Sequence, residues 1–462
     1  MARSRAFIGC LLAAAAGCGQ QAVDKPGEEA PPLYASTYEP LPGEPVVIEN
    51  ATILTGVGER IDDGVLIMRG GRIEAVGAGL EAPAGLARID AAGKWVTPGI
   101  IDNHSHLGVY PSPQVAAVAD GNEVSDPNTA QVWAEHAVWP QDPGFAAALA
   151  GGVTTLQILP GSANLFGGRS VVVKNVPART VQEMKFPGAP HGLKMACGEN
   201  PKRIYGVERL VAPGTRMGNV AGYRQAWMKA KDYMAAQEAF DSGAADEAPE
   251  HDLQLETLAG VLRGEILVHN HCYRADEMAV MLDVAREFGY RIASFHHAVE
   301  AYKVADLLAE SGTCAAMWAD WWGFKLEAFD AVRENIAMVD KAGACAIVHS
   351  DSDTGIQRLN QEAAKAMAAA QRSGIEVDRA GAMRWLSLNP ARSLGIDTQT
   401  GSLEAGKMAD VVVWDGDPFS VYTKAEKVFI DGALVFDRAD TARQPVSDFE
   451  LGLVSLDGGA PL

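Results

Sequence analysis

Hydrophobic and polar residues near both ends of the chain follow a pattern that differs from the one in the middle. From Val46 to Ile89, and again in the C-terminal segments ADVVVWDGDPF and AEKVFIDGALVF, β-branched residues alternate or cluster between Gly, Asn and Asp. This spacing predicts short strands joined by turns, and Gly70-Gly71 and Asp431-Gly432 are typical of hairpin turns. We therefore predict one small β-sandwich domain built from both chain ends, residues 43–96 and 400–440.

The middle of the chain, residues 97–399, alternates short apolar runs with helical segments. Runs such as VTTLQIL, GEILVHNH and ACAIVHSD are separated by stretches such as DEMAVMLDVAREFG. Strands that alternate with helices predict a parallel α/β fold. About eight such units in roughly 300 residues favour a (β/α)8 TIM barrel over an open sheet, because barrels of this kind have about this size.

The first residues have the features of an export signal. Arg3 and Arg5 precede an apolar run, Ala6 to Gly17, that is too short to cross a bilayer comfortably. The run ends in Ala15-Ala16-Gly17-Cys18, which resembles a bacterial lipobox, in which the cysteine is lipidated. We predict that residues 1–18 are a lipoprotein signal peptide and that Cys18 is the lipidation site. The protein is then exported and membrane-anchored, periplasmic or at the cell surface; a plain signal peptide or anchor is the alternative.

The remaining terminal segments and the charge limit the partners. Residues 19–42, rich in Gln, Glu, Pro, Gly and Ala, are predicted to be a disordered tether, and residues 441–462 a C-terminal tail. The formal net charge of −20 argues against nucleic acid as a partner, because phosphate binding needs a basic face. Membrane contact is expected only through the N-terminal lipid anchor, and a homo-oligomer is left open.

Four cysteines lie beyond the signal segment. Their spacing is wide and irregular and contains no CxxC pair, so the sequence indicates neither a disulfide framework nor a zinc knuckle. We interpret them as small buried residues. They are Cys197, Cys272, Cys314 and Cys345.

The strongest chemical signal is a pair of histidines after an apolar strand. His104 and His106 stand in the run PGIIDNHSH. Residues two apart on a strand point the same way, so both imidazoles can face one metal ion. Further histidines and an aspartate follow downstream at the ends of predicted strands, which strengthens a pattern that would be weak alone.

These motifs together resemble the amidohydrolase superfamily. TPGIIDNHSH resembles the signature of its first barrel strand, and LSLNPARSLGI with GSLEAGKMADVVVWDGDPF resembles its C-terminal signature. HCYRADEM, HHAVEAYKVAD and VHSDSD are similar to the imidazolonepropionase-like branch. The resemblance extends from Val46 to Arg438. Met408 departs from it, because the family usually has an acidic residue there, at a position away from the metals.

The resemblance implies metal ligands at the ends of several barrel strands, beginning with His104 and His106. His271 matches the histidine of the fifth strand, and His269, two residues earlier on the same face, is a competitor. His297 matches the sixth strand. His296 points to the opposite face of that strand and is interpreted as a structural core histidine.

Asp351 matches the carboxylate ligand of the eighth strand. His349 and Asp353 share its side of the strand and are less favoured. By the same resemblance, Asp351 is also the expected catalytic base.

A lysine of the fourth strand decides between one metal and two. Lys194 in GLKMACGEN matches the lysine that is carboxylated in binuclear members of the superfamily. A lysine inside an apolar strand is costly to bury, which favours a special role. Lys174 in SVVVKN is a rival, and Glu199 or Cys197 could substitute for Lys194.

The predicted ligands favour hydrolytic chemistry. Histidine and carboxylate suit zinc, so we predict one or two Zn²⁺ ions, with Mn, Fe or Co as alternatives. Such an ion brings the pKa of bound water towards ~7, and Asp351 can take and return the proton. We predict hydrolysis of a C–N bond, in a cyclic or peptide-like amide of small size, by metal-bound hydroxide. The alternatives are an ester or lactone hydrolase, a deaminase, or a non-catalytic metal-binding surface lipoprotein.

Substrate contacts are harder to derive from the sequence. Arg274, three residues after His271, is predicted to bind a substrate carboxylate, because a guanidinium suits a planar anion. A salt bridge at the start of a helix is the alternative. Trp318, Trp321 and Trp322 either wall a pocket or, as we slightly favour, pack the barrel against a helix.

Replacing Cys18 tests the predicted anchor. The Cys18→Ser protein should lack the lipid and appear in the soluble fraction, because serine offers no thiol for acylation. Fractionation and labelling with a clickable fatty acid measure this. A Cys18→Ser protein that stays with the membranes would contradict the lipobox interpretation.

Overall fold

The computed structural model describes residues 34–112 and 114–444. The predicted signal peptide with Cys18, most of the predicted tether and most of the C-terminal tail lie outside the described residues. None of the described helices is long and apolar enough to cross a membrane.

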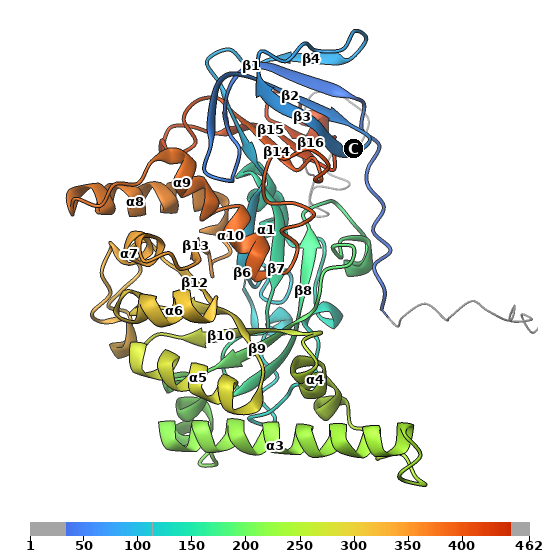
Figure 1. Ribbon diagram of the computed structural model, residues 1–462, viewed down its shortest axis with the longest axis vertical. Coiled ribbons are helices and arrows are strands. Elements are labelled where there is room, and N and C mark those ends of the chain that lie inside the picture. The colour runs from blue at the N-terminus through green and yellow to red at the C-terminus, as the bar shows by residue number, and fades with distance from the viewer. Residues whose placement is uncertain (1–33, 113, 445–462) are drawn as a thin grey trace, which may run out of the picture. The chain divides into compact units, whose positions relative to one another are not determined.

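Strands from both chain ends join in one sheet (Figure 1). The joining pair is β5 with β14, which run antiparallel with Thr97 opposite Val412. Buried side chains such as Ile48, Leu66 and Phe429 form the core beneath it. The described pairings make a single eight-stranded sheet in the order β16-β15-β14-β5-β1-β2-β3, with β4 beside β1, and the sandwich arrangement stays a prediction. The strands are β1 (Val46–Leu54), β2 (Arg60–Arg69), β3 (Arg72–Ala78), β4 (Ala87–Asp90), β5 (Trp95–Pro98), β14 (Val411–Trp414), β15 (Ala425–Ile430) and β16 (Ala433–Asp437).

The middle of the chain forms a second eight-stranded sheet that follows the chain from β6 to β13. Its strands pair in parallel except for β8, which is antiparallel to both β7 and β9. The prediction of an all-parallel barrel is therefore wrong at this strand, because residues 159–165 link β7 to β8 without a crossover helix. The strands are β6 (Ile100–Ser105), β7 (Val153–Ile158), β8 (Phe166–Lys174), β9 (Gly192–Ala196), β10 (Leu267–Cys272), β11 (Ile292–His297), β12 (Cys314–Met317) and β13 (Ala346–Val348).

The sheet closes into a TIM-like barrel through a bridging segment rather than through a direct ladder between β13 and β6. The Val348 amide donates to the Trp385 carbonyl (3.1 Å), and the Ile101 amide donates to the Leu386 carbonyl (2.8 Å). At the mouth, the Asp351 amide donates to the His104 carbonyl (3.0 Å). The first and last barrel strands are thus held together along their length.

Helices cover the outside of the barrel, and Figure 1 shows α5, α6 and α7 beside the strands from β10 to β13. In α5, Met278, Met281, Leu282 and Ala285 are buried at helical spacing, and Gly289, with φ of 82°, ends the helix. The α-helices are α1 (Pro143–Ala150), α2 (Glu199–Pro201), α3 (Arg216–Asp241), α4 (Leu253–Leu262), α5 (Ala275–Phe288), α6 (Ala305–Ser311), α7 (Asn335–Lys341), α8 (Leu359–Arg372), α9 (Arg379–Arg384) and α10 (Leu388–Ser393).

Lys174 connects the barrel to the sheet made by the chain ends. Because β8 is reversed, its last residue lies at the end of the barrel opposite the mouth. The buried Lys174 Nζ lies 3.0 Å from both Asp410 carboxylate oxygens and 3.1 Å from Asp431 Oδ1. A buried lysine bonded to two carboxylates is accounted for by ion pairing, so Lys174 is not a rival of Lys194 at the barrel mouth.

The four cysteines form two disulfides, which corrects the interpretation of them as separate buried residues. Cys197 is bonded to Cys272, and Cys314 to Cys345. The register explains both bonds, since Ala196 lies opposite His271 and Ala315 lies opposite Ala346 on neighbouring parallel strands. The bonded cysteines are 75 and 31 residues apart because whole crossover segments separate the strands, and this hides the pairing in the sequence.

Candidate metal centre

The predicted ligands come from strands far apart in the chain but end at the same mouth of the barrel. His104 is in β6 and His106 follows it, Lys194 is in β9, His271 in β10 and His297 in β11, while Asp351 follows β13. Active sites of this fold lie at the end of the barrel where the parallel strands have their C-termini.

Four of these side chains direct ligand atoms at a common point. His104 Nε2 lies 3.3 Å from His106 Nε2, and Asp351 Oδ1 lies 3.4 Å and 3.2 Å from these two nitrogens. Lys194 Nζ lies 3.4 Å from His104 Nε2. His106 Nδ1 lies 2.8 Å from the Leu159 carbonyl oxygen, which can only accept, so the ring keeps its proton on Nδ1 and its Nε2 is free.

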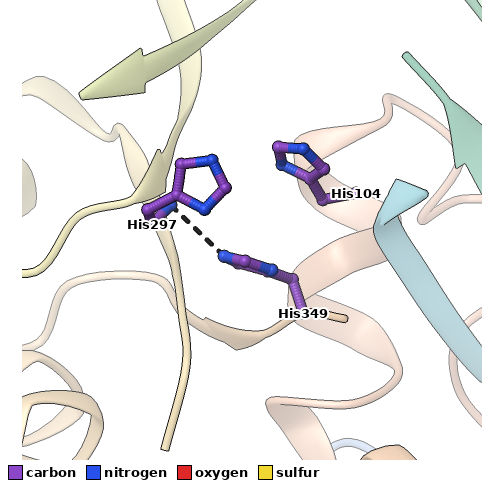
Figure 2. Close-up of side chains that lie close together, drawn as sticks. All are labelled: His104, His297 and His349. Atoms are coloured by element: carbon purple, nitrogen blue, oxygen red, sulfur yellow. Dashed lines mark hydrogen bonds between the residues drawn. The ribbon is translucent and has the colours of Figure 1, made fainter. Parts of the chain in front are cut away.

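A second group of nitrogens adjoins the first. His104, His297 and His349 each offer a nitrogen within 4.8 Å of the others, and Figure 2 shows their three rings close together on separate segments of the chain. The His297 amide donates to His349 Nε2 (3.2 Å), which holds the His349 ring in place. The ring centroid of His271 lies 4.5 Å from that of His297. His349, which the sequence favoured less than Asp351 as a ligand, therefore belongs to the candidate site.

The donor set fits a cation. Among the described residues, the Nδ1 atoms of His271 and His297 are buried without a hydrogen-bond partner. Unpaired buried nitrogens are costly, and a bound cation would satisfy them. Nitrogen ligands beside one carboxylate are the set that zinc and similar ions take.

Burial sets the protonation of these groups. It lowers the pKa values of His104, His271 and His297 well below the ordinary value, which keeps the imidazoles neutral and able to bind metal. Burial also lowers the pKa of Lys194 to about 8. Burial alone would raise the pKa of Asp351, but the neighbouring His106, His349 and Lys194 lower it below its ordinary value, so this carboxyl stays ionised.

Asp102 is a buried residue of the site that sequence reasoning missed. Its Oδ1 accepts from the His104 amide (3.1 Å) and the Ser350 amide (3.2 Å), and the Ser350 hydroxyl donates to its Oδ2. Asp102 thereby joins β6 to the segment that carries Asp351. Its place two residues before His104, on the same face of the strand, was the available signal.

His296 is fully buried, as expected of a core histidine, but it faces the barrel interior and not the opposite face of the strand. Its Nδ1 lies 2.8 Å from His104 Nδ1, and its Nε2 lies 2.9 Å from His269 Nδ1. Strict alternation fails because His297 has a φ of 70°, a left-handed turn that lets neighbouring residues both face inward. His269 bonds to His296 and belongs to neither candidate ligand group.

The tryptophans after β12 stand at the site. Trp318 stacks on His297 with ring centroids 4.3 Å apart, and Trp321 stacks on Trp318 at 5.3 Å. Trp318 is buried, whereas Trp321 and Trp322 are partly exposed. The pocket between them reaches His297, so they wall the site rather than pack the barrel against a helix as we favoured.

The remaining predicted residues are engaged elsewhere. Arg274 pairs with Asp276 at the exposed start of α5 (2.9 Å), the alternative named from the sequence, and its role in substrate binding stays a prediction. Cys197 is bonded to Cys272 and offers no thiolate. Glu199 lies 3.6 Å from Lys325, whose Nζ also donates to Asn200 Oδ1 (3.2 Å).

Comparisons with known proteins agree with this geometry. The amidohydrolase family matches residues 95–438. The chain is 32% identical over 457 residues to amidohydrolase tasK of Hapsidospora irregularis, covering 91% of this chain but only 46% of that protein. It is 26% identical to an imidazolonepropionase of Mesorhizobium japonicum, covering 79% of this chain and 90% of that protein.

A solved structure extends the likeness to the whole fold. The crystal structure of an amidohydrolase from Thermotoga maritima MSB8 is 36% identical, with a TM-score of 0.78, and the match covers 85% of this chain and all of that one. The family match spans most of the chain, and the motifs around His104, His271 and Asp351 lie within it. The chain therefore belongs to the amidohydrolase family and, within its superfamily, to the imidazolonepropionase-like branch.

Proposed function

We propose that this amidohydrolase is a metal-dependent enzyme that hydrolyses a C–N bond in a small cyclic amide or peptide-like amide. The proposal rests on four side chains that lie close together at the barrel mouth. His104 Nε2 is within 3.4 Å of His106 Nε2, of Lys194 Nζ and of Asp351 Oδ1. Asp351 Oδ1 is also 3.2 Å from His106 Nε2. The family membership supports the hydrolytic part of it.

The residues that would hold the metal are those of the two adjoining groups. His104, His106 and Asp351 surround the first position, with Lys194 near it. His297 belongs to the second group, and the His271 ring, which is in neither group, lies beside it with centroids 4.5 Å apart. Zn²⁺ suits this set best, and Mn, Fe or Co would take the same donors. When bound, such an ion acidifies water and polarises the carbonyl of the substrate.

Asp351 is the proposed catalytic base. Its carboxylate is about a quarter exposed at the mouth and lies 3.2 Å from His106 Nε2. Because its pKa is lowered, it is ionised at neutral pH and can take a proton from the attacking water. Returning that proton to the leaving nitrogen completes the cleavage of an amide. The Trp318–Trp321 stack beside His297 restricts how the substrate approaches.

Lys194 is the proposed bridge between two ions. Its side chain is only 1% exposed, and its Nζ lies beside His104. Burial favours the neutral amine, which is the form that reacts with carbon dioxide to give a carbamate. The two oxygens and the negative charge of that carbamate suit a pair of cations.

We further propose that the protein works outside the cytoplasm, as the lipobox-like segment predicts. Support comes from the Cys197–Cys272 and Cys314–Cys345 disulfides, because disulfides persist mainly in oxidising compartments. Cys18 would then tether the enzyme to a membrane through its lipid.

Metal removal and a substrate panel test the proposed reaction. The chelated protein should lose hydrolysis of cyclic amides and dipeptides, and stoichiometric Zn²⁺ should restore it. Asp351→Asn, which keeps the shape of the side chain but lacks the base, should lower turnover by about 10²- to 10⁴-fold. Turnover of lactones or loss of a ring amine, without amide cleavage, would instead favour the ester or deaminase alternatives. Bound metal without any turnover would favour the binding lipoprotein.

Replacing Lys194 separates one ion from two. Lys194→Ala should reduce bound metal from about two ions per chain to one or none, measured by elemental analysis. Turnover should fall by more than the roughly 100-fold that outer partners of a ligand contribute. Bicarbonate or a short carboxylic acid should restore part of it.

Lys194→Arg is the matched control for charge and length. It should not restore activity, because a guanidinium stays protonated and cannot be carboxylated. If the parent protein holds one ion and Lys194→Ala keeps both ion and turnover, the site is mononuclear and the carbamate is excluded.

A further inference from the structure

Three buried histidines form a continuous chain from the mouth into the barrel. His104 Nδ1 contacts His296 Nδ1 at 2.8 Å, and His296 Nε2 contacts His269 Nδ1 at 2.9 Å. All three side chains are fully buried. Barrel interiors are usually filled by branched apolar residues, so three linked imidazoles there require a reason beyond packing.

The hydrogen bonds fix the proton positions along the chain. If His104 Nε2 faces a cation, a neutral ring must carry its proton on Nδ1 and donate it to His296 Nδ1. His296 then carries its own proton on Nε2 and donates it to His269 Nδ1. His269 in turn is protonated on Nε2, an atom without a partner among the described residues.

The lower end of the chain faces polar groups as well. A Cβ added at Gly192 would lie 2.8 Å from His269 Cδ2 and 2.7 Å from Gln157 Nε2, so both side chains border this glycine. Gln157 Oε1 is also buried without a described partner. Gln157 Nε2 donates to the Ser170 hydroxyl (2.8 Å), so polar side chains lie near the inner end of the histidine chain.

The local backbone is arranged to keep His296 in this path. The φ of 70° at His297 is unfavourable for a residue other than glycine. It allows His296 to reach His104 while the neighbouring His297 ring still reaches the mouth, 4.8 Å from the His104 ring. An ordinary strand would turn one of the two away from the barrel axis.

We propose that His296 is a positioning residue that holds His104 in the tautomer and orientation that present Nε2 to the metal, with His269 fixing His296 in turn. This inference rests on the proposed metal site. His296 itself binds neither metal nor substrate: it accepts the Nδ1 proton of His104, so that one nitrogen of the ligand is always free at the mouth. Such partners of a metal-binding histidine orient the ring and raise its affinity for the ion.

A pair of substitutions separates the hydrogen bond from mere packing. His296→Leu fills much of the space but cannot accept a proton. His296→Asn can place its Oδ1 near the position of the histidine Nδ1 and accept from His104. His251→Leu is the matched control, because the side chain of His251 is 72% exposed and bonds to Glu256.

The readouts are zinc affinity, by competition with a chelator, and the visible spectrum of the Co²⁺-loaded protein. His296→Leu should bind zinc about 10- to 100-fold more weakly and shift the Co²⁺ bands. His296→Asn should remain close to the parent protein in both, as should His251→Leu. Unchanged affinity and an unchanged spectrum in folded His296→Leu would overturn the inference.

Two further outcomes keep the test decisive. Thermal unfolding of the metal-free protein shows whether His296→Leu is folded. If it is not, the variants His269→Leu and His269→Asn are compared instead. His269→Leu should then weaken zinc binding and His269→Asn should not, and equal affinities would overturn the inference. A parent protein that binds no zinc at all would refute the proposed metal site, and with it the role of His296. A parent protein that binds zinc, together with leucine variants that bind it more weakly, is expected only if both proposals hold.

Discussion

The join between the first and last barrel strands determines the geometry of the site. Asp102 accepts hydrogen bonds from the amides of His104 and Ser350, and the Asp351 amide donates to the His104 carbonyl. These bonds place the carboxylate of Asp351, the proposed catalytic base, 3.4 Å from His104 Nε2. They join segments 248 residues apart at the barrel mouth, where the backbone of Trp385 and Leu386 no longer bridges the two strands. The other strands add their side chains to a centre that this join has already placed.

Two buried lysines show how surroundings decide function. Lys174 is neutralised by Asp410 and Asp431, so its charge is accounted for inside the fold. Lys194 is equally buried and has His104 as its near neighbour, and burial lowers its pKa to about 8. The reversed direction of β8 sends Lys174 to the far end of the barrel, while the parallel β9 carries Lys194 to the neighbourhood of the ligands. The same residue type therefore forms an internal ion pair at one end of the barrel and lies beside the proposed metal site at the other.

The sequence predicted the parts of the site that depend on period and motif. His104 and His106 share a face because strand residues alternate, and the downstream candidate ligands His271, His297 and Asp351 were named from the family resemblance. Contacts between distant segments could not be predicted from the spacing of residues. The Cys197–Cys272 bond depends on the register of two strands, and the reversed direction of β8 depends on the short link that precedes it. His296 was misplaced because the alternation rule assumes extended backbone, which His297 does not adopt.

The position of a bound ion tests the central claim most directly. Crystals of the zinc-loaded protein, measured on both sides of the zinc absorption edge, would locate each ion by anomalous difference density. The account predicts a peak between His104 Nε2, His106 Nε2 and Asp351 Oδ1, with a second beside His271 and His297 if Lys194 is carboxylated. Zinc bound in stoichiometric amount but away from these side chains, or no ordered zinc at the barrel mouth, would contradict it.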